Sequence, residues 1–293
     1  MSDLSVRPLH EAIGAEIEGV DPSEPLTDEA LAPLREAFDD YSVLVFRNLD
    51  IDEDWQRALV FGLIHEDPAA YDDMSTRKTL RVSNRTEDSA APYGRLLFHC
   101  DNMWARTPQF ALSLYGERVE PPSAPTQFVS MVAGWETLSE DLKGRVASLE
   151  ARHGFEGGYP NRGGDDDVTD VDFGASRSVV RPVAWQHPRT GKTLLYASQQ
   201  ATIEVLGLSA DENEALLAEL FAHLYRPSAV VQHDWREGDL VIWDNVAVQH
   251  ARGPVDLEGP ERTLRKVFGP MHLDPDEVLM PTYSKVADRT PSQ

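Results

Sequence analysis

The chain has one cysteine and few basic residues. A single cysteine excludes an intrachain disulfide, and Cys100 follows an apolar run, so we expect it in the hydrophobic core and not bound to a metal. The 27 lysines and arginines are outnumbered by 50 aspartates and glutamates, which gives a formal net charge of −23. Because contacts with phosphates need clustered basic side chains, we expect no nucleic-acid partner.

The sequence also lacks a long apolar segment. No run approaches the roughly 20 residues that cross a membrane, and no apolar stretch typical of a signal peptide opens the chain. We therefore expect a cytoplasmic protein without a membrane partner. The length of 293 residues permits one or two domains. We favour a single domain over 1–293, with a mobile loop around 157–178 as a candidate lid, and leave the oligomeric state open, a homo-oligomer included.

A His-x-Asp motif carries the first chemical signal. His99 and Asp101 follow the apolar residues 96–98, and in a strand residues i and i+2 point to the same face, so both side chains could reach one ion. The tripeptide recurs at 65–67 and 272–274. The first repeat closes a helical pattern, and the second has no histidine after it.

A second histidine, His250, follows a strand-like run and an Asp-Asn turn over 238–245. Two imidazoles and one carboxylate on one side of a metal leave the other side open to substrates and O2, as in Fe(II) oxygenases. Arg262 lies in the next strand-like run, 260–268. An arginine near the metal offers a planar fork that suits a carboxylate, which implies a dicarboxylate ligand.

With these motifs the chain resembles the Fe(II)/2-oxoglutarate-dependent dioxygenases of the taurine and 2,4-dichlorophenoxyacetate dioxygenase (TauD/TfdA) family. The resemblance covers most of the chain, from Gly14–Val20 to 235–266. It implies that Fe(II) is bound by His99, Asp101 and His250, that 2-oxoglutarate is bound by Arg262 and Thr126, and that O2 is the other cosubstrate.

The resemblance further implies hydroxylation, desaturation or a related C–H oxidation of a small molecule, with release of succinate and CO2. Candidate substrates are a small carboxylate or sulfonate, or a hydrophobic intermediate of secondary metabolism such as a terpenoid acid or lactone. Lys266 aligns with an arginine that binds an anionic substrate in taurine-type enzymes. Arg95 lies four residues before His99, so on a strand it would face the same side and could line the pocket. Met103, with Leu96 and Phe98, suggests an apolar wall of the substrate pocket.

Two other functions could use the same residues. One is a jelly-roll binding protein that has lost the chemistry, and the other is a zinc hydrolase with the same triad. The intact triad and Arg262 argue against the binding protein, and a zinc hydrolase has no evident need for an arginine or threonine placed to receive a dicarboxylate. Succinate formation and O2 uptake that depend on Fe(II) and 2-oxoglutarate would separate the three.

Many short strands with helices at the periphery predict a mostly β chain with a double-stranded β-helix core, that is, a cupin-like jelly roll. We interpret His153, His187, His223 and His233 as surface or turn residues. The apolar patterns predict helices over about 28–38 and 136–152, a helix opened by the capping box Ser209 to Glu212, and strands at 16–20, 43–46, 79–83, 96–101, 111–115 and 127–131.

Overall fold

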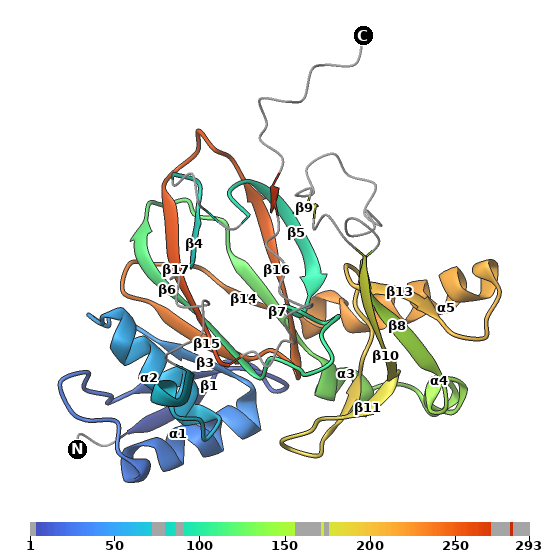
Figure 1. The fold of residues 1–293 in the computed structure, drawn as a ribbon, viewed down its shortest axis with the longest axis horizontal. Coiled ribbons are helices and arrows are strands. Elements are labelled where there is room, and N and C mark those ends of the chain that lie inside the picture. The colour runs from blue at the N-terminus through green and yellow to red at the C-terminus, as the bar shows by residue number, and fades with distance from the viewer. Residues whose placement is uncertain are drawn as a thin grey trace.

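The computed structural model describes residues 4–71, 80–85, 89, 91–155, 171–172, 176–270 and 282–283. Two sheets face each other across a shared apolar core, so the fold is a jelly roll (Figure 1). In order across it, the larger sheet contains β1 (Ser5–Pro8), β2 (Ala15–Glu18), β3 (Val43–Phe46), β15 (Leu240–Asp244), β6 (Ala111–Val119), β17 (Arg262–Phe268) and β4 (Leu80–Ser83). The smaller sheet contains β14 (Val231–His233), β7 (Thr126–Ser130), β16 (Val248–Val255) and β5 (Gly94–His99).

The larger sheet is buried on both faces near its centre. All four residues of β3 are buried. Val43 and Val45 face the core between the two sheets, whereas Leu44 and Phe46 face the helices α1 (Asp28–Tyr41) and α2 (Glu53–Leu63). Burial on both faces explains why this strand is an unbroken apolar run rather than an alternating one.

A lobe lies beside the jelly roll (Figure 1). Its sheet has the order β10 (Arg177–Pro182), β8 (Glu150–Phe155), β13 (Thr202–Val205) and packs with helices around a third apolar core. The helices of the lobe are α3 (Met131–Glu136), α4 (Glu140–Val146) and α5 (Ala210–Leu224), and the hairpin of β11 (Ala184–Gln186) and β12 (Thr193–Leu195) lies with them. The remaining short elements of the chain are the pair β9 (Val171–Asp172) and β18 (Thr282–Tyr283) and two 3-10 turns, Pro68–Tyr71 beside α2 and Pro227–Ala229 after α5.

The prediction of one helix over 136–152 is wrong. Helix α3 ends at Glu136, where the predicted helix begins, and the separate helix α4 occupies 140–146, because the Ser139 hydroxyl accepts a hydrogen bond from the Leu142 backbone and starts a new helix. The last part of the predicted helix is strand β8, which pairs with both β10 and β13. The apolar spacing read as helical still marks buried residues, since Leu138, Leu142 and Val146 all lie in the core of the lobe.

The other predicted helices and strands are present, and the Ser209 capping box opens α5 as expected. The loop predicted around 157–178 lies largely outside the described residues. Within the described part of the chain, no helix is both long and apolar enough to cross a membrane.

Candidate metal centre

The two histidines of the predicted triad are neighbours in the smaller sheet. His99 is the last residue of β5, and it pairs directly with His250 of β16. Residues that face each other in an antiparallel ladder point to the same side, and the two imidazole rings lie with their centroids 4.2 Å apart. The ladder alone therefore brings these two nitrogen donors together.

Asp101 reaches the histidines by a different route from the predicted one. The strand ends at His99, so Asp101 lies in a turn and not at position i+2 of a strand. Asn102 follows with a φ of 54°, in the left-handed region that asparagine tolerates. The turn keeps the Asp101 carboxylate beside the rings, with Oδ1 3.4 Å from His99 Nε2 and 3.8 Å from His250 Nε2.

These three side chains fit a metal ion. One ligand atom from each lies within 4.8 Å of the other two. The Nδ1 of His99 is 2.7 Å from the carbonyl oxygen of Leu97, so a proton on Nδ1 leaves Nε2 free to coordinate. Such a hydrogen bond to the second ring nitrogen is the usual way in which a protein orients a histidine ligand.

The protonation states also suit a metal. Burial, together with repulsion from His99, holds the pKa of His250 well below its ordinary value. Burial by itself would raise the pKa of Asp101, but attraction from Lys266 and the interactions with the two histidines outweigh it and hold that pKa well below its usual range. A neutral imidazole and an ionised carboxylate are the forms that bind a cation.

Lys266 of β17 reaches this triad. Its ammonium group forms an ion pair with Oδ2 of Asp101, whereas Oδ1 faces the histidines. The neighbouring Arg265 points to the opposite side of the sheet, where it donates to the Gln56 side chain, 2.8 Å away, and to the Ile51 carbonyl. As the strand periodicity predicts, only one of the two cations faces the site.

Arg262, also in β17, is a buried cation. Its side chain donates to the carbonyl of Ala124, 3.1 Å away, and lies 3.5 Å from the hydroxyl of Thr126. Only 3% of Arg262 is exposed, and no carboxylate of the described residues forms an ion pair with it. Burial, with repulsion from Arg252, holds the pKa of Arg262 well below its ordinary value.

Two residues of this region escaped the sequence analysis. Trp235 donates from its indole nitrogen to the Thr126 hydroxyl, 2.9 Å away, and its ring lies beside Arg262. Asn245 forms hydrogen bonds with the backbone of Asp101. The Asp-Asn turn before His250 was the one sequence feature that could have pointed to Asn245. Because asparagine is common in turns, that feature predicted no contact between Asn245 and another residue.

The predicted substrate contacts have varied settings. Arg95 is half-buried in β5, whereas Met103 is 2% exposed in the core between the sheets. Phe98 stacks on Tyr225, with ring centroids 4.4 Å apart. Cys100 is buried in the core as predicted, and its thiol contacts the Val248 carbonyl.

The jelly roll brings two histidines and one carboxylate together and buries an arginine on a neighbouring strand. This combination is typical of the class of non-haem iron oxygenases that use a 2-oxo acid. The chain matches the family described as taurine catabolism dioxygenase TauD, TfdA family over residues 5–268. It belongs to this family.

Known relatives agree with this membership. The chain is 28% identical over 262 residues to (S)-phenoxypropionate/alpha-ketoglutarate-dioxygenase of Sphingobium herbicidovorans, a match that covers 87% of this chain and 91% of that protein. It is also 28% identical over 287 residues to pentalenolactone F synthase of Streptomyces avermitilis, covering 87% and 90%. The crystal structure of a taurine dioxygenase from Burkholderia xenovorans superposes with a TM-score of 0.72 at 25% identity, covering 97% of each chain.

The chain is therefore an Fe(II)- and 2-oxoglutarate-dependent dioxygenase that acts with O2 on a small organic molecule. The membership favours this function over a zinc hydrolase or a silent binding protein.

Proposed function

We propose that His99, Asp101 and His250 bind Fe(II), that Arg262 and Thr126 bind the distal carboxylate of 2-oxoglutarate, and that the substrate is a small organic acid. The buried guanidinium of Arg262 is the observation that carries the cosubstrate assignment. A cation out of water without a carboxylate partner is costly, and an incoming anion offsets that cost.

The spacing along the smaller sheet supports the same assignment. Phe128 of β7 is the direct partner of His250, so Thr126 lies diagonally from His250 on the same face. Diagonal neighbours are about 7–8 Å apart. In 2-oxoglutarate two methylene groups separate the keto carbon from the distal carboxylate, so one molecule can reach from the triad to Thr126 and Arg262.

Each protein group then has a defined task. Arg262 pairs with the distal carboxylate and fixes its orientation. The Thr126 oxygen accepts from Trp235, which leaves its own hydrogen to donate to the same carboxylate. When bound, Fe(II) supplies the redox chemistry that couples decarboxylation of 2-oxoglutarate to oxidation of the substrate.

For the substrate, we propose that a carboxylate is recognised by Lys266. Its ammonium carries three donors, so contact with Asp101 leaves others for an anion. The similarity to an enzyme named for phenoxypropionate supports a carboxylate. The equal identity to pentalenolactone F synthase favours a terpenoid acid or lactone as the second candidate.

An assay of O2 uptake and succinate formation tests this proposal with a panel of aryloxy carboxylates, terpenoid acids and lactones. We expect turnover of at least one acid, and a KM for that acid that rises about tenfold or more in Lys266→Met but changes little in Lys266→Arg. The neutral amide of the same acid is the matched control, because its KM should be similar in all three proteins. Equal losses with the acid and the amide would contradict recognition by charge.

Several expectations from the sequence stay predictions. They are the single domain over 1–293, the cytoplasmic location, the lack of nucleic-acid and membrane partners, and substrate contacts by Arg95 and Met103; the oligomeric state stays open.

A further inference from the structure

The side chain of Asn245 forms a two-point clamp on the backbone of Asp101. Its Oδ1 accepts from the Asp101 N–H, and its Nδ2 donates to the Asp101 carbonyl, both at 2.9 Å. The ladder between β5 and β16 reaches only as far as the pair His99 and His250, so Asp101 lies beyond the last backbone pairing of its strand. The asparagine amide supplies the two hydrogen bonds that a neighbouring strand would otherwise supply.

Further contacts hold this turn against the segment that leads into β6. The Nδ2 of Asn245 also donates to the carbonyl of Gln109, 3.2 Å away. The Gln109 side chain accepts from Asn102, the residue with a φ of 54°, and donates to Gly269. The turn after β5 is thus fixed by side-chain amides from two other segments of the chain.

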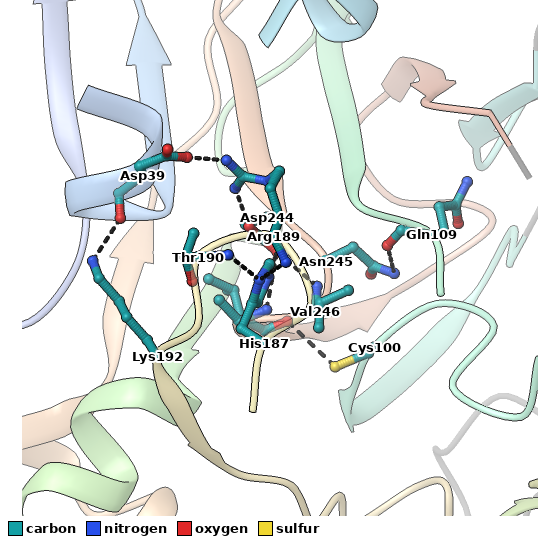
Figure 2. A network of polar contacts seen from close by, with 12 residues as sticks. Asp39, Cys100, Gln109, His187, Arg189, Thr190, Lys192, Asp244, Asn245 and Val246 are labelled. Carbon is teal, nitrogen blue, oxygen red and sulfur yellow. Dashed lines mark hydrogen bonds and ion pairs between the residues drawn. The ribbon is translucent and has the colours of Figure 1, made fainter. Parts of the chain in front are cut away.

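A buried ionic cluster holds Asn245 in place (Figure 2). The preceding residue, Asp244, is 1% exposed, and its carboxylate accepts from the backbone N–H groups of Val246 and Ala247. It also accepts from His187 Nε2 at 3.1 Å and from Arg189 at 2.5 Å. These bonds define the turn between β15 and β16, and leave Asn245 little freedom to follow Asp101 if that residue moves.

Arg189 links the cluster to the rest of the fold. It forms an ion pair with Asp39 at the end of α1, and its backbone N–H donates to His187 Nδ1 at 3.1 Å. Because Nδ1 of His187 accepts, its Nε2 carries the proton that is donated to Asp244. The turn that carries Asn245 is therefore anchored through the 187–192 hairpin to the first helix (Figure 2).

We propose that Asn245 is a positioning residue for the metal ligand Asp101, an inference that rests on the proposed function. Asn245 contacts the backbone of Asp101, and the carboxylate is left to face the histidines and Lys266. Its effect on a bound metal thus comes only through the place of the carboxylate. Outer partners of metal ligands commonly contribute about 10- to 100-fold to metal affinity.

Titration of the metal-free protein with Mn(II), followed by electron paramagnetic resonance, tests this role without turnover. In Asn245→Ala and in the isosteric Asn245→Asp, which lacks the amide donors, we expect the Kd for Mn(II) to rise about 10- to 100-fold. At saturating Mn(II), the affinity for 2-oxoglutarate should change less than about threefold, because Arg262 and Thr126 are untouched.

Gln56→Ala is the matched control. Gln56 is another fully buried amide, which links α2 to Arg265 and Ser113 away from the triad. It should lower Tm about as much as Asn245→Ala, because each variant removes buried hydrogen bonds, yet leave the Kd for Mn(II) within about twofold. A matching loss of Mn(II) affinity in Gln56→Ala, or an unchanged Kd in both Asn245 variants, overturns the proposal.

A milder variant keeps the test decisive if both Asn245 variants fail to fold. Asn102→Gly suits the φ of 54° and removes the Asn102 side chain together with its contact to Gln109, so we expect a folded protein whose Mn(II) Kd rises about three- to tenfold. In that case an unchanged Kd would overturn the proposal. Asp101→Ala distinguishes failure of the ligand assignment from failure of the positioning role. If Asp101→Ala retains its affinity for Mn(II), the proposed ligands are refuted. If Asp101→Ala loses that affinity while the Asn245 variants keep it, only the positioning role of Asn245 is refuted.

Discussion

The two halves of the metal site are held by different means. His99 and His250 are direct partners in a backbone ladder, whereas Asp101 lies past the end of its strand and is held by the side chains of Asn245 and Lys266. Ladder hydrogen bonds do not depend on side-chain identity, but a side-chain contact is lost with one substitution. The carboxylate half should therefore be the more sensitive to mutation of its surroundings.

The largest expected effect comes from removing a donor. In His99→Ala, and equally in Asp101→Ala, we expect metal affinity to fall by more than about 100-fold and turnover to be lost, because an outer partner alone costs up to that much. Metal titration and succinate formation measure both. Cys100→Ala, between the two positions, is the control and should retain metal and activity, because its thiol lies in the core. Loss of iron in Cys100→Ala would contradict the ligand assignment.

The next largest effect, on the KM for 2-oxoglutarate, is expected from substitution of Arg262. In Arg262→Met we expect the KM for 2-oxoglutarate to rise about 10- to 100-fold, since a hydrogen bond to a charged group contributes about 1.5–3 kcal/mol. The ligand-free variant should be at least as stable as the parent. Burial lowers the pKa of Arg262, so charging it disfavours the folded state, and an apolar replacement removes that cost. Thermal unfolding without ligand checks the sign, and a marked fall in Tm would argue for a structural role instead.

A smaller effect, on the pH dependence of metal affinity, is expected from substitution of Lys266 beside Asp101. Lys266 helps to keep the pKa of Asp101 low, so the carboxylate of the parent stays ionised well into the acid range. As pH falls, Lys266→Met should lose metal affinity at a higher pH than the parent, because the Asp101 pKa rises without the ammonium. Mn(II) titration over a pH series measures this, and Lys266→Arg should follow the parent. Coincident profiles for all three proteins would rule out the ion pair as the cause.

The smallest effect on metal binding is expected from Arg189→Met, in the anchor of the turn. Burial alone would raise the pKa of Asp244, but His187 and Arg189 together hold it below its usual value. That contribution to stability is present above the unfolded pKa and is lost as pH falls through the folded one. The variant should lose about 3 kcal/mol and unfold at higher pH on acidification. Mn(II) affinity of the folded protein should change less than about threefold, and a larger change would extend the positioning role to Arg189.

The sequence predicts most of the jelly roll because its strands carry their own signals. The short, β-branched-rich apolar run Val43–Phe46 is typical of a strand buried on both faces, and the Ser209 capping box starts its helix by local hydrogen bonds. The lobe is harder to predict. The β8 segment was read as the end of a helix, because its pairing with β10 and β13 depends on residues far along the chain.

The site divides in the same way. The proposed metal ligands His99, Asp101 and His250 and the proposed cosubstrate ligand Arg262 follow from the sequence, because residue type and motif spacing single them out. The other histidines illustrate the opposite case. His187 does lie beside a turn, as expected, although it is 1% exposed and bound to Asp244, whereas the expectation of a surface or turn position is wrong for His153 and His233, which are buried in β8 and β14.

By itself the sequence determined which candidate donors the chain offers and which strands carry the two histidines, because these depend on residue type and local periodicity. Only the tertiary structure decided how Asp101 joins them. Its strand ends two residues early, and the carboxylate is placed by Asn245 from a turn more than a hundred residues away. A side-chain contact between distant segments leaves no periodic signal in the sequence, so it becomes visible only when the chain is folded.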